Sequence, residues 1–336
     1  MKVDGGLGSD LALAGKAAQR AKAQGYDGVW TAETSHDPFL PLLLAAEHTD
    51  DLELGTGIAV AFARNPMILA NLGYDLQAFS KGRFMLGLGS QIRPHIEKRF
   101  SMTWSHPAPR MREFILAMRA IWACWQDRTP LKFEGEFYTH KIMTPFFDPG
   151  PNPYGTPRVF LAAVGEMMTE VCAEVADGML VHGFTTERYL REVTLPALDR
   201  GLAKGDKQRT DIELSCPIFI VTGENDEQVA AAEEGVKRQI AFYGSTPAYR
   251  PVLELHGWGD LQPELNSLSK EGKWAEMGEL ITEDILSAFA VVAAPDDVPG
   301  EVLTRFGDVI DRLSFYLPYQ ADEEQIKSIL TGFKSV

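Results

Sequence analysis

The sequence has few cysteines, no long apolar run and no apolar signal segment at its start. Cys124, Cys172 and Cys216 lie far apart and form no CxxC pair or Cys/His cluster, which argues against a disulfide framework and a zinc site. No apolar run approaches the roughly 18 residues of a membrane span. We therefore expect a cytoplasmic protein with reduced, buried thiols, no metal and no membrane partner.

Positive charge is also scarce. The chain has 32 Lys and Arg against 47 Asp and Glu, a formal net charge of -15 at pH 7. Proteins that bind nucleic acid usually present a basic stripe, and none is visible here, so we expect no nucleic-acid partner. With 336 residues, 45% of them hydrophobic, the chain is long enough for one large α/β domain or two smaller ones.

Strand-like and helix-like segments alternate along the chain. The predicted strands cover residues 3–7, 27–33, 52–60, the core of 81–90, 158–163, 178–182, 211–222 and 312–317. The predicted helices cover residues 11–24, 38–49, 66–80, 110–125, 166–176, 187–203, 226–242, 299–306 and 322–333. Eight strands in regular alternation with helices favour an α/β fold of the (β/α)8 TIM-barrel type over an open sheet.

Two segments interrupt the alternation. An insertion at about 91–155 follows the fourth strand and contains a predicted hairpin between Pro130 and Tyr154. A second insertion, at about 244–285, follows the seventh strand, and its many prolines and glycines between Gly244 and Leu280 predict a loop-rich segment. We expect one TIM-barrel domain over residues 1–336.

The fourth strand lies in the run KGRFMLGLGS, from Lys81 to Ser90. Gly87 and Gly89 at its end permit tight turns and let a ligand approach the backbone closely. A dinucleotide fingerprint would need a third glycine where this chain has Ile92, and it would stand on the first strand. The run therefore predicts a ligand-binding strand end, with a purely structural role of the glycines as the alternative.

Active sites of such barrels lie at the C-terminal ends of the strands. The candidates are the residues that follow the strands, at 33–37, 57–64, 87–93, 164–167, 182–184, 222–225 and 316–319. Few of them are charged. That composition suits a broad, mostly neutral ring system better than a metal ion or a bare phosphate.

An ordered series of motifs carries a resemblance. The segments 55–60, 64–66, 76–80 and 82–90, followed by 161–165 and 176–178, resemble the bacterial luciferase-like monooxygenase superfamily, and most of all its branch that uses the deazaflavin coenzyme F420. The resemblance implies a (β/α)8 barrel and a homodimer. It also implies a bulge with a non-proline cis peptide under the central ring of the flavin or deazaflavin, matched by Gly57 and Ile58. A plain barrel strand is the alternative.

The resemblance further implies cofactor contacts on the loops after the fourth and fifth strands. The matching residues are Gly87, Gly89, Ser90, Val164, Gly165 and Glu166. Backbone N–H groups near a helix N-terminus would favour an anion there. We expect the Glu166 side chain to cap the following helix instead of facing a phosphate.

Two histidines are candidates for the chemistry. The resemblance to F420-dependent sugar-phosphate dehydrogenases implies that His36 contacts the cofactor and acts as a base that accepts a substrate hydroxyl proton. Capping the helix near Pro38 is its alternative role. Those dehydrogenases carry an acidic residue where this chain has Ser90, so their full mechanism does not transfer. His182 is expected to contact cofactor or substrate, or to be structural. The aromatic residues Trp104, Tyr249, Trp258 and Trp274 are expected to wall an apolar substrate pocket or to pin an insertion to the barrel.

The expected function is that of an F420-dependent oxidoreductase that moves hydride between the deazaflavin and a small organic substrate. One alternative is an FMN-dependent monooxygenase of the same fold, which activates dioxygen and needs a partner reductase. The other is a non-catalytic flavin-binding relative. The choice depends on the cofactor, which composition and spacing leave open.

Overall fold

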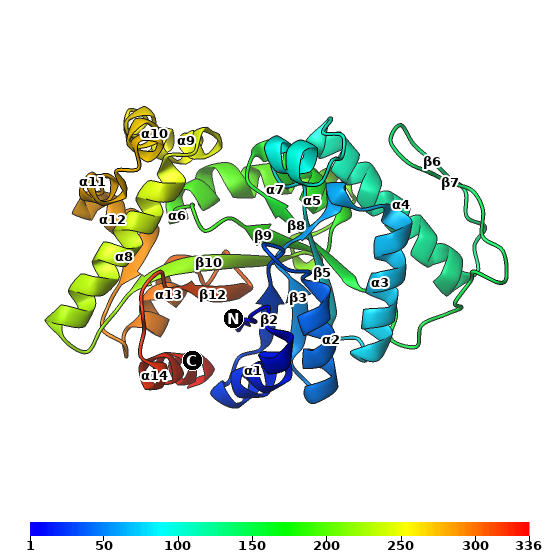
Figure 1. Ribbon diagram of the computed structural model, residues 1–336, viewed down its shortest axis with the longest axis horizontal. Coiled ribbons are helices and arrows are strands. Elements are labelled where there is room, and N and C mark those ends of the chain that lie inside the picture. The colour runs from blue at the N-terminus through cyan, green and yellow to red at the C-terminus, as the bar shows by residue number, and fades with distance from the viewer. Residues whose placement is uncertain (336) are drawn as a thin grey trace. The chain divides into compact units, whose positions relative to one another are not determined.

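The computed structural model describes residues 1–335 (Figure 1). The chain divides into two compact units. The N-terminal unit contains residues 4–180 and 197–213. The C-terminal unit contains residues 1–3, 181–196 and the chain from 214 onward. That residues 1–336 form a single domain stays a prediction.

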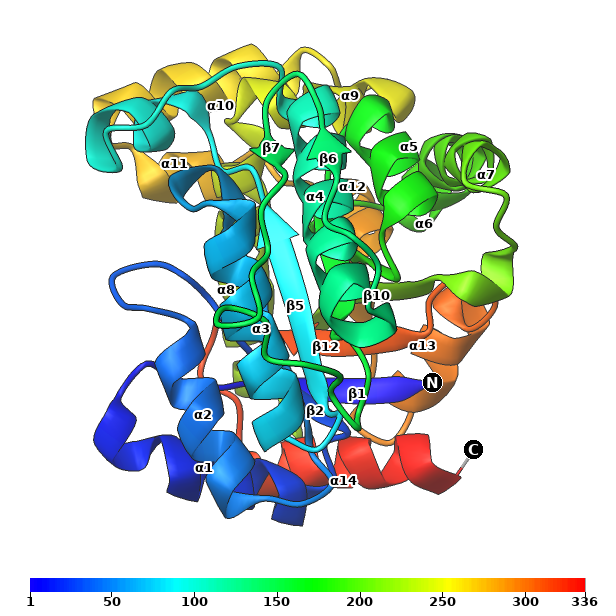
Figure 2. The same ribbon diagram turned by 90° about the vertical axis from the view of Figure 1, so that its right-hand side faces the viewer.

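The N-terminal unit contains the first six barrel strands, although β1 begins and β9 ends just outside it. Its strands are β1 (Lys2–Gly6), β2 (Gly28–Thr31), β3 (Glu53–Thr56), β4 (Ala59–Val60), β5 (Phe84–Gly89), β6 (Phe133–Glu134), β7 (Thr139–His140), β8 (Arg158–Ala163) and β9 (Gly178–Val181). Its helices are α1 (Leu11–Gln24), α2 (Phe39–His48), α3 (Pro66–Phe79), α4 (Pro107–Asp127), α5 (Glu166–Val175) and α7 (Leu195–Lys204). α3 packs on β5 and on α4 (Figure 2).

The C-terminal unit contains β10 (Glu213–Val221), β11 (Ala290–Val292) and β12 (Arg312–Tyr316). Its helices are α6 (Glu187–Tyr189), α8 (Asp226–Gly244), α9 (Arg250–Leu255), α10 (Leu261–Glu271), α11 (Trp274–Glu279), α12 (Glu283–Phe289), α13 (Val298–Phe306) and α14 (Glu323–Ser335). A π-helical turn at Leu190–Thr194 interrupts the helix predicted over 187–203. The first half of β10 pairs with β12 and the second half with β11, both in parallel.

The strand order has the closed form of the predicted barrel. Parallel pairs connect β12, β1, β2, β3, β5, β8 and β9 in that order, and β10 pairs with both β9 and β12. These eight strands, each followed by at least one helix, make a (β/α)8 barrel, as predicted. Within residues 1–335, no helix has the length and apolar composition needed to cross a membrane.

Local signals explain several helix ends. The Asp10 carboxylate accepts the Ala12 N–H at the start of α1, and Gly25 ends the helix with φ of +100°. Asn65 caps α3 in the same way, immediately before Pro66. The predicted bounds of α1 and β8 agree with the structure at both ends.

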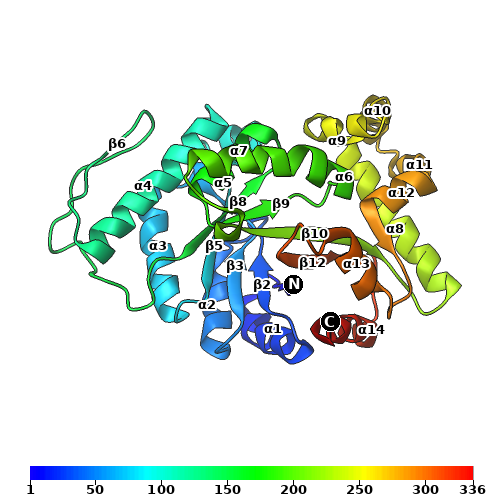
Figure 3. The same cartoon turned by 180° about the vertical axis from the view of Figure 1, so that it is seen from behind.

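The first insertion contains the predicted hairpin, as a short antiparallel β6–β7 pair beside α4 (Figure 3). The loop-rich prediction for the second insertion is wrong, because α9, α10 and α11 occupy most of it. Pro251 lies in the first turn of α9, where its missing N–H costs nothing, and Gly272 ends α10 with φ of +73°. Val252, Leu253, Leu265 and Met277 join the buried core of the C-terminal unit. These prolines and glycines therefore mark helix ends rather than loops.

Arg83 of the fourth-strand run has a structural role. Its guanidinium donates to the carbonyl oxygens of Ala46 and Thr49 at the end of α2, at 3.1 and 2.8 Å, and to Leu52 O at 2.7 Å. The last carbonyls of a helix have no partner within the helix, and a buried carbonyl without a partner is costly. Arg83 therefore joins the C-terminus of α2 to the start of β5.

Candidate functional site

The third barrel strand is interrupted where the resemblance implied a bulge. The strand predicted over 52–60 ends as β3 at Thr56 and resumes as β4 at Ala59. The peptide bond between Gly57 and Ile58 is cis, as predicted. The interruption places residues 57–58 beyond the end of β3, where a barrel positions its ligand-binding residues.

Hydrogen bonds from the β2 end fix this segment on both sides of the cis bond. Gly57 N donates to Thr31 O at 2.6 Å, and Glu33 N donates to Ile58 O at 3.2 Å. The Glu33 carboxylate then accepts Val60 N at 2.7 Å and Arg64 Nη1 at 2.5 Å. The Glu33 side chain is only 7% exposed. The backbone N–H of Glu33 thus holds Ile58, and its buried carboxylate, which accepts two hydrogen bonds, holds Val60.

The two glycines at the end of β5 make room for this segment. A Cβ on Gly87 would lie 1.7 Å from Thr56 O, and the Thr56 hydroxyl exchanges hydrogen bonds with Gly87 N and O. A Cβ on Gly89 would lie 2.9 Å from the Ile58 side chain. The structure therefore brings together four predicted site residues, Gly57, Ile58, Gly87 and Gly89. It also gives both β5 glycines a packing role, and their contact with a cofactor stays a prediction.

His36 lies in the β2–α2 loop, three residues after Glu33, and is exposed. It does not cap α2, because Asp37 accepts the N–H groups of Phe39 and Leu40 at 2.9 and 3.3 Å. Asp37 also faces Arg64 at 3.5 Å. The alternative of a helix-capping histidine is therefore wrong. The His36 ring has no hydrogen-bond partner in the described chain, so both nitrogens are free for a ligand.

The loop after β8 presents an open helix end. Val164, Gly165 and Glu166 are exposed, and Gly165 is the N-cap of α5 without any side-chain cap. The prediction that Glu166 caps α5 is wrong, because its carboxylate accepts Arg200 Nη2 at 2.6 Å instead. Glu166 is the first residue within the helix, whereas a capping side chain stands one residue earlier. The uncapped backbone N–H groups of this helix end are suited to an anion.

Ser90, the remaining predicted residue of the N-terminal unit, is half-buried, and its hydroxyl donates to Gln91 O at 3.1 Å. This bond lies within the loop itself. Ser90 thus supplies a small polar side chain at the end of β5, and no acid.

His182, in the C-terminal unit, follows β9 and belongs to a cluster of aromatic rings. It stacks on Tyr249 with ring centroids 4.4 Å apart, and it contacts Tyr243 edge-on at 4.8 Å. Its Nδ1 accepts the Phe184 N–H at 3.0 Å, and its Nε2 lies 3.1 Å from the Tyr249 hydroxyl. Burial lowers the pKa of His182 to about 4. The imidazole is therefore neutral at pH 7.

This lowered pKa predicts a dependence of stability on pH. The unfolded chain binds a proton at His182 below about pH 6.5, but the folded chain only below about 4. The stabilisation is thus complete above pH 6.5 and is lost as the pH falls towards 4. Between pH 7 and 5, we expect the wild-type free energy of unfolding to fall by about 2 kcal/mol more than that of His182→Gln. Urea unfolding of both proteins at pH 7 and pH 5 measures this difference. An equal fall of the free energy of unfolding in both proteins would contradict the prediction.

Sequence reasoning missed several residues of these clusters. Glu33 and Arg64 lay in the candidate ranges, but nothing in their spacing indicated that they meet over the cis bond. Tyr316 lay in the candidate range 316–319, but Tyr243, whose hydroxyl lies 2.5 Å from that of Tyr316, was not considered. Tyr316 ends β12, and residues at the ends of barrel strands gather at one end, but Tyr243 lies in the last turn of α8, to which this rule does not apply.

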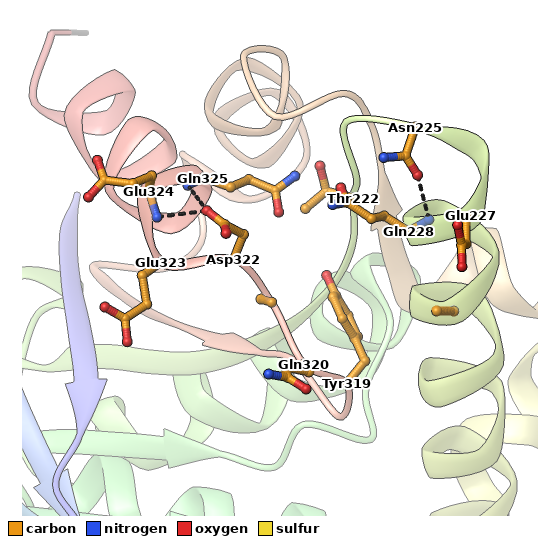
Figure 4. A pocket seen from close by; sticks show the side chains of 12 residues that line it. Thr222, Asn225, Glu227, Gln228, Tyr319, Gln320, Asp322, Glu323, Glu324 and Gln325 are labelled. Carbon is orange, nitrogen blue, oxygen red and sulfur yellow. Dashed lines mark hydrogen bonds between the residues drawn. The ribbon is translucent and has the colours of Figure 1, made fainter.

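A separate polar cavity of about 830 Å³ lies in the C-terminal unit, between the start of α8 and the loop before α14 (Figure 4). Four carboxylates line it, from Glu227, Asp322, Glu323 and Glu324. Thr222, Asn225 and Tyr319 of the candidate ranges 222–225 and 316–319 line this cavity, whereas none of the residues predicted to contact the cofactor does. Among residues 1–335, no three His, Cys, Asp or Glu side chains are grouped to hold a metal ion.

Three protein relatives have sequence similarity over most of the chain. An uncharacterized protein of Mycobacterium tuberculosis is 60% identical over 99% of this chain and 98% of its own length. The 5,10-methylenetetrahydromethanopterin reductase of Archaeoglobus fulgidus is 26% identical over 83% and 81%. The F420-dependent glucose-6-phosphate dehydrogenase of Intrasporangium calvum is 26% identical over 88% and 92%.

Solved structures share the fold. The coenzyme F420-dependent tetrahydromethanopterin reductase of Methanopyrus kandleri matches with a TM-score of 0.78 and 18% identity over 99% of this chain and 96% of its own. The EDTA monooxygenase of Chelativorans matches with a TM-score of 0.71 and 15% identity over 100% and 94%. The family model of luciferase-like monooxygenases matches residues 2–311. The chain therefore belongs to the luciferase-like monooxygenase family.

Proposed function

We propose that this protein is an F420-dependent oxidoreductase that transfers hydride between the deazaflavin and a small organic substrate. The observation that carries the proposal is the interrupted third strand. Its cis Gly57–Ile58 bond is fixed by Glu33 and packed against Gly89. A backbone segment held this firmly is a preorganised support for a planar ring.

Relatives favour F420 over FMN. Two relatives that match over more than 80% of this chain are named an F420-dependent glucose-6-phosphate dehydrogenase and a 5,10-methylenetetrahydromethanopterin reductase. The monooxygenase likeness, at 15% identity, concerns the fold alone. An FMN monooxygenase with a partner reductase is the second candidate, and a non-catalytic relative is the third.

The residues of the N-terminal unit fit the cofactor. Gly57 and Ile58 would support the ring, and the exposed N-terminus of α5, with Val164 and Gly165, would receive the anionic side chain. A Cβ on Gly165 would meet no atom within 4 Å, so the approach is open. The Glu166 carboxylate would oppose an anion, but its ion pair with Arg200 offsets that charge. We propose Ser90 and the β5 glycines as further contacts.

Bound F420 supplies the carbon that accepts or gives the hydride, and the protein supplies orientation and proton transfer. We propose that His36 takes the substrate hydroxyl proton during oxidation and returns it during reduction. Its exposed ring, free of protein partners, allows a substrate to reach either nitrogen. His182 is proposed as a contact of cofactor or substrate in its neutral form.

Co-purification tests the cofactor. The chain is expressed in a host that makes both F420 and FMN, and the bound chromophore is identified by mass spectrometry. We expect F420. Recovery of FMN with FMNH2-dependent oxygen uptake would favour the monooxygenase, and recovery of neither would favour the non-catalytic relative.

We also propose that the protein is a homodimer. Leu40 and Leu43 of α2 and Ile68 and Phe79 of α3 are 40–62% exposed. Leu40, Leu43 and Phe79 line an apolar groove of about 290 Å³, and Ile68 lies one helical turn before Leu72, which also lines it. Soluble monomers rarely expose contiguous apolar patches of this kind. A second copy of the chain, with its own α2 and α3, would cover the patch by two-fold symmetry.

Charged side chains introduced into this apolar patch are expected to dissociate the dimer into monomers. We expect Leu43→Glu combined with Ile68→Glu to sediment as a monomer, because two carboxylates would be buried without partners. Leu13→Glu, at a leucine of α1 that is 56% exposed, is the matched control and is expected to stay dimeric. Sedimentation velocity gives the answer, and a monomeric wild type would refute the dimer.

The three cysteines support a reducing compartment. Cys124, Cys172 and Cys216 are buried and free, and burial raises the pKa of the Cys172 and Cys216 thiols to about 12. We propose a cytoplasmic location on this basis.

A further inference from the structure

The hydroxyl of Tyr249 has a hydrogen that no group in the described chain accepts. The Phe184 N–H donates to His182 Nδ1, so the neutral imidazole carries its proton on Nε2. That proton is then donated to the Tyr249 hydroxyl oxygen at 3.1 Å. Since the oxygen accepts from His182, its own hydrogen points to another acceptor, and none is present within residues 1–335. The half-buried ring leaves this hydrogen available to a ligand.

The neighbouring tyrosines add a second donor. The hydroxyls of Tyr243 and Tyr316 lie 2.5 Å apart, so one donates to the other and one hydrogen remains. The rings of Tyr243 and Tyr249 are 6.1 Å apart. Burial raises the pKa of Tyr249 and of Tyr316, so both phenols keep their protons at pH 7. The cluster thus offers hydrogen-bond donors without a formal charge.

The chemistry of these donors selects the ligand. A phosphate or carboxylate loses much hydration on binding, and Arg or Lys usually compensates for the loss. Among residues 1–335, no Lys, Arg, Asp or Glu side chain forms a hydrogen bond or a cation–π contact with His182, Tyr243, Tyr249 or Tyr316. An uncharged oxygen loses less hydration, and a phenol hydrogen bond suffices for it.

We propose that Tyr249 binds the oxygen atom of an uncharged carbonyl or alcohol group, with His182 as its positioning residue. The proposal rests on the proposed oxidoreductase function and narrows its substrates to ketones, aldehydes and alcohols, as opposed to phosphorylated or carboxylated compounds. Tyr249 donates to the oxygen. His182 keeps the phenol turned so that its hydrogen faces the ligand.

Cyclohexanone labelled with ¹³C at the carbonyl is the probe, with cyclohexanecarboxylate as the charged comparison. Ligand-observed NMR gives the Kd, and infrared spectroscopy gives the carbonyl stretch of the bound ketone. Wild type is compared with Tyr249→Phe, His182→Ala and His182→Gln. Tyr319→Phe is the matched control, because Tyr319 lies in the same unit and its hydroxyl already donates to Ile220 O.

We expect wild type to bind cyclohexanone with a carbonyl stretch lowered by hydrogen bonding, and to bind the carboxylate at least tenfold more weakly. Tyr249→Phe is expected to raise the ketone Kd about tenfold and to abolish the infrared shift. His182→Gln keeps an N–H donor and is expected to retain the shift, which His182→Ala weakens. Tyr319→Phe is expected to match wild type.

The proposal is overturned if cyclohexanone does not bind, if Tyr249→Phe leaves Kd and infrared shift unchanged, or if the carboxylate binds as tightly. If Tyr249→Phe does not fold, NMR of wild type with ¹³Cζ-tyrosine decides, since ketone must shift the Tyr249 resonance. F420 affinity is measured on the same samples. Ketone binding through Tyr249 without F420 binding would refute the proposed function and leave this inference standing.

Discussion

Gly87→Ala is expected to lower the free energy of unfolding by more than about 4 kcal/mol, enough to prevent accumulation of folded protein. The added Cβ would lie 1.7 Å from Thr56 O, a backbone atom that no side-chain rotation can move. Relief requires β3 and β5 to separate, although Leu54 and Gly55 pair there with Phe84 and Met85. The hydrogen bonds between Thr56 and Gly87 would be lost as well.

Gly165→Ala is the matched control for this prediction. Gly165 is an exposed glycine in the extended conformation, and its Cβ would meet no atom within 4 Å. We expect a change within about 0.5 kcal/mol. Soluble yield and urea unfolding measure both variants. If Gly87→Ala unfolds at the wild-type urea concentration, the packing account of the β5 glycines is wrong.

His36→Ala is expected to reduce kcat by about 10² to 10⁴, the usual contribution of a general acid or base. The Kd for F420 is expected to stay within about tenfold of wild type, because Gly57, Ile58 and the α5 end carry most of the proposed binding. The fold is expected to be unaffected, since the exposed imidazole has no hydrogen-bond partner within residues 1–335.

The assay follows bleaching of the F420 visible band with an alcohol identified by screening. His95→Ala is the control, because His95 is an exposed histidine of the first insertion outside the proposed site. We expect that variant to turn over at the wild-type rate. Unchanged turnover in His36→Ala would remove His36 from the mechanism.

The fold could be predicted because its signals are local. Apolar alternation, Asp10 before α1 and Gly25 after it are read within a few residues, and the βα repeat then favours the barrel. The prediction of loops in the second insertion was wrong because Pro251 and Gly272 are each compatible with two kinds of structure. Both residues break helices, and both also mark where helices begin and end. Only the apolar residues buried against α8 show that these residues mark helix ends and not loops.

The site could be predicted only in part, because its key contacts join distant residues. The motif at Gly57–Ile58 located the cis bond, but Glu33 reaches Val60 across 27 positions of the chain. His182 and Tyr249 are 67 positions apart, on different elements. Spacing along a chain does not encode such pairings. The prediction that Glu166 caps α5 was wrong for the same reason, since its partner Arg200 lies on α7.

The central claim, that this barrel binds a deazaflavin and uses it for hydride transfer, is tested most directly by titrating the purified apo chain with F420 and with FMN in parallel. Fluorescence gives both dissociation constants. We expect a Kd for F420 in the micromolar range or below, and binding of FMN at least a hundredfold weaker. Tight binding of FMN together with no measurable binding of F420 would contradict the account.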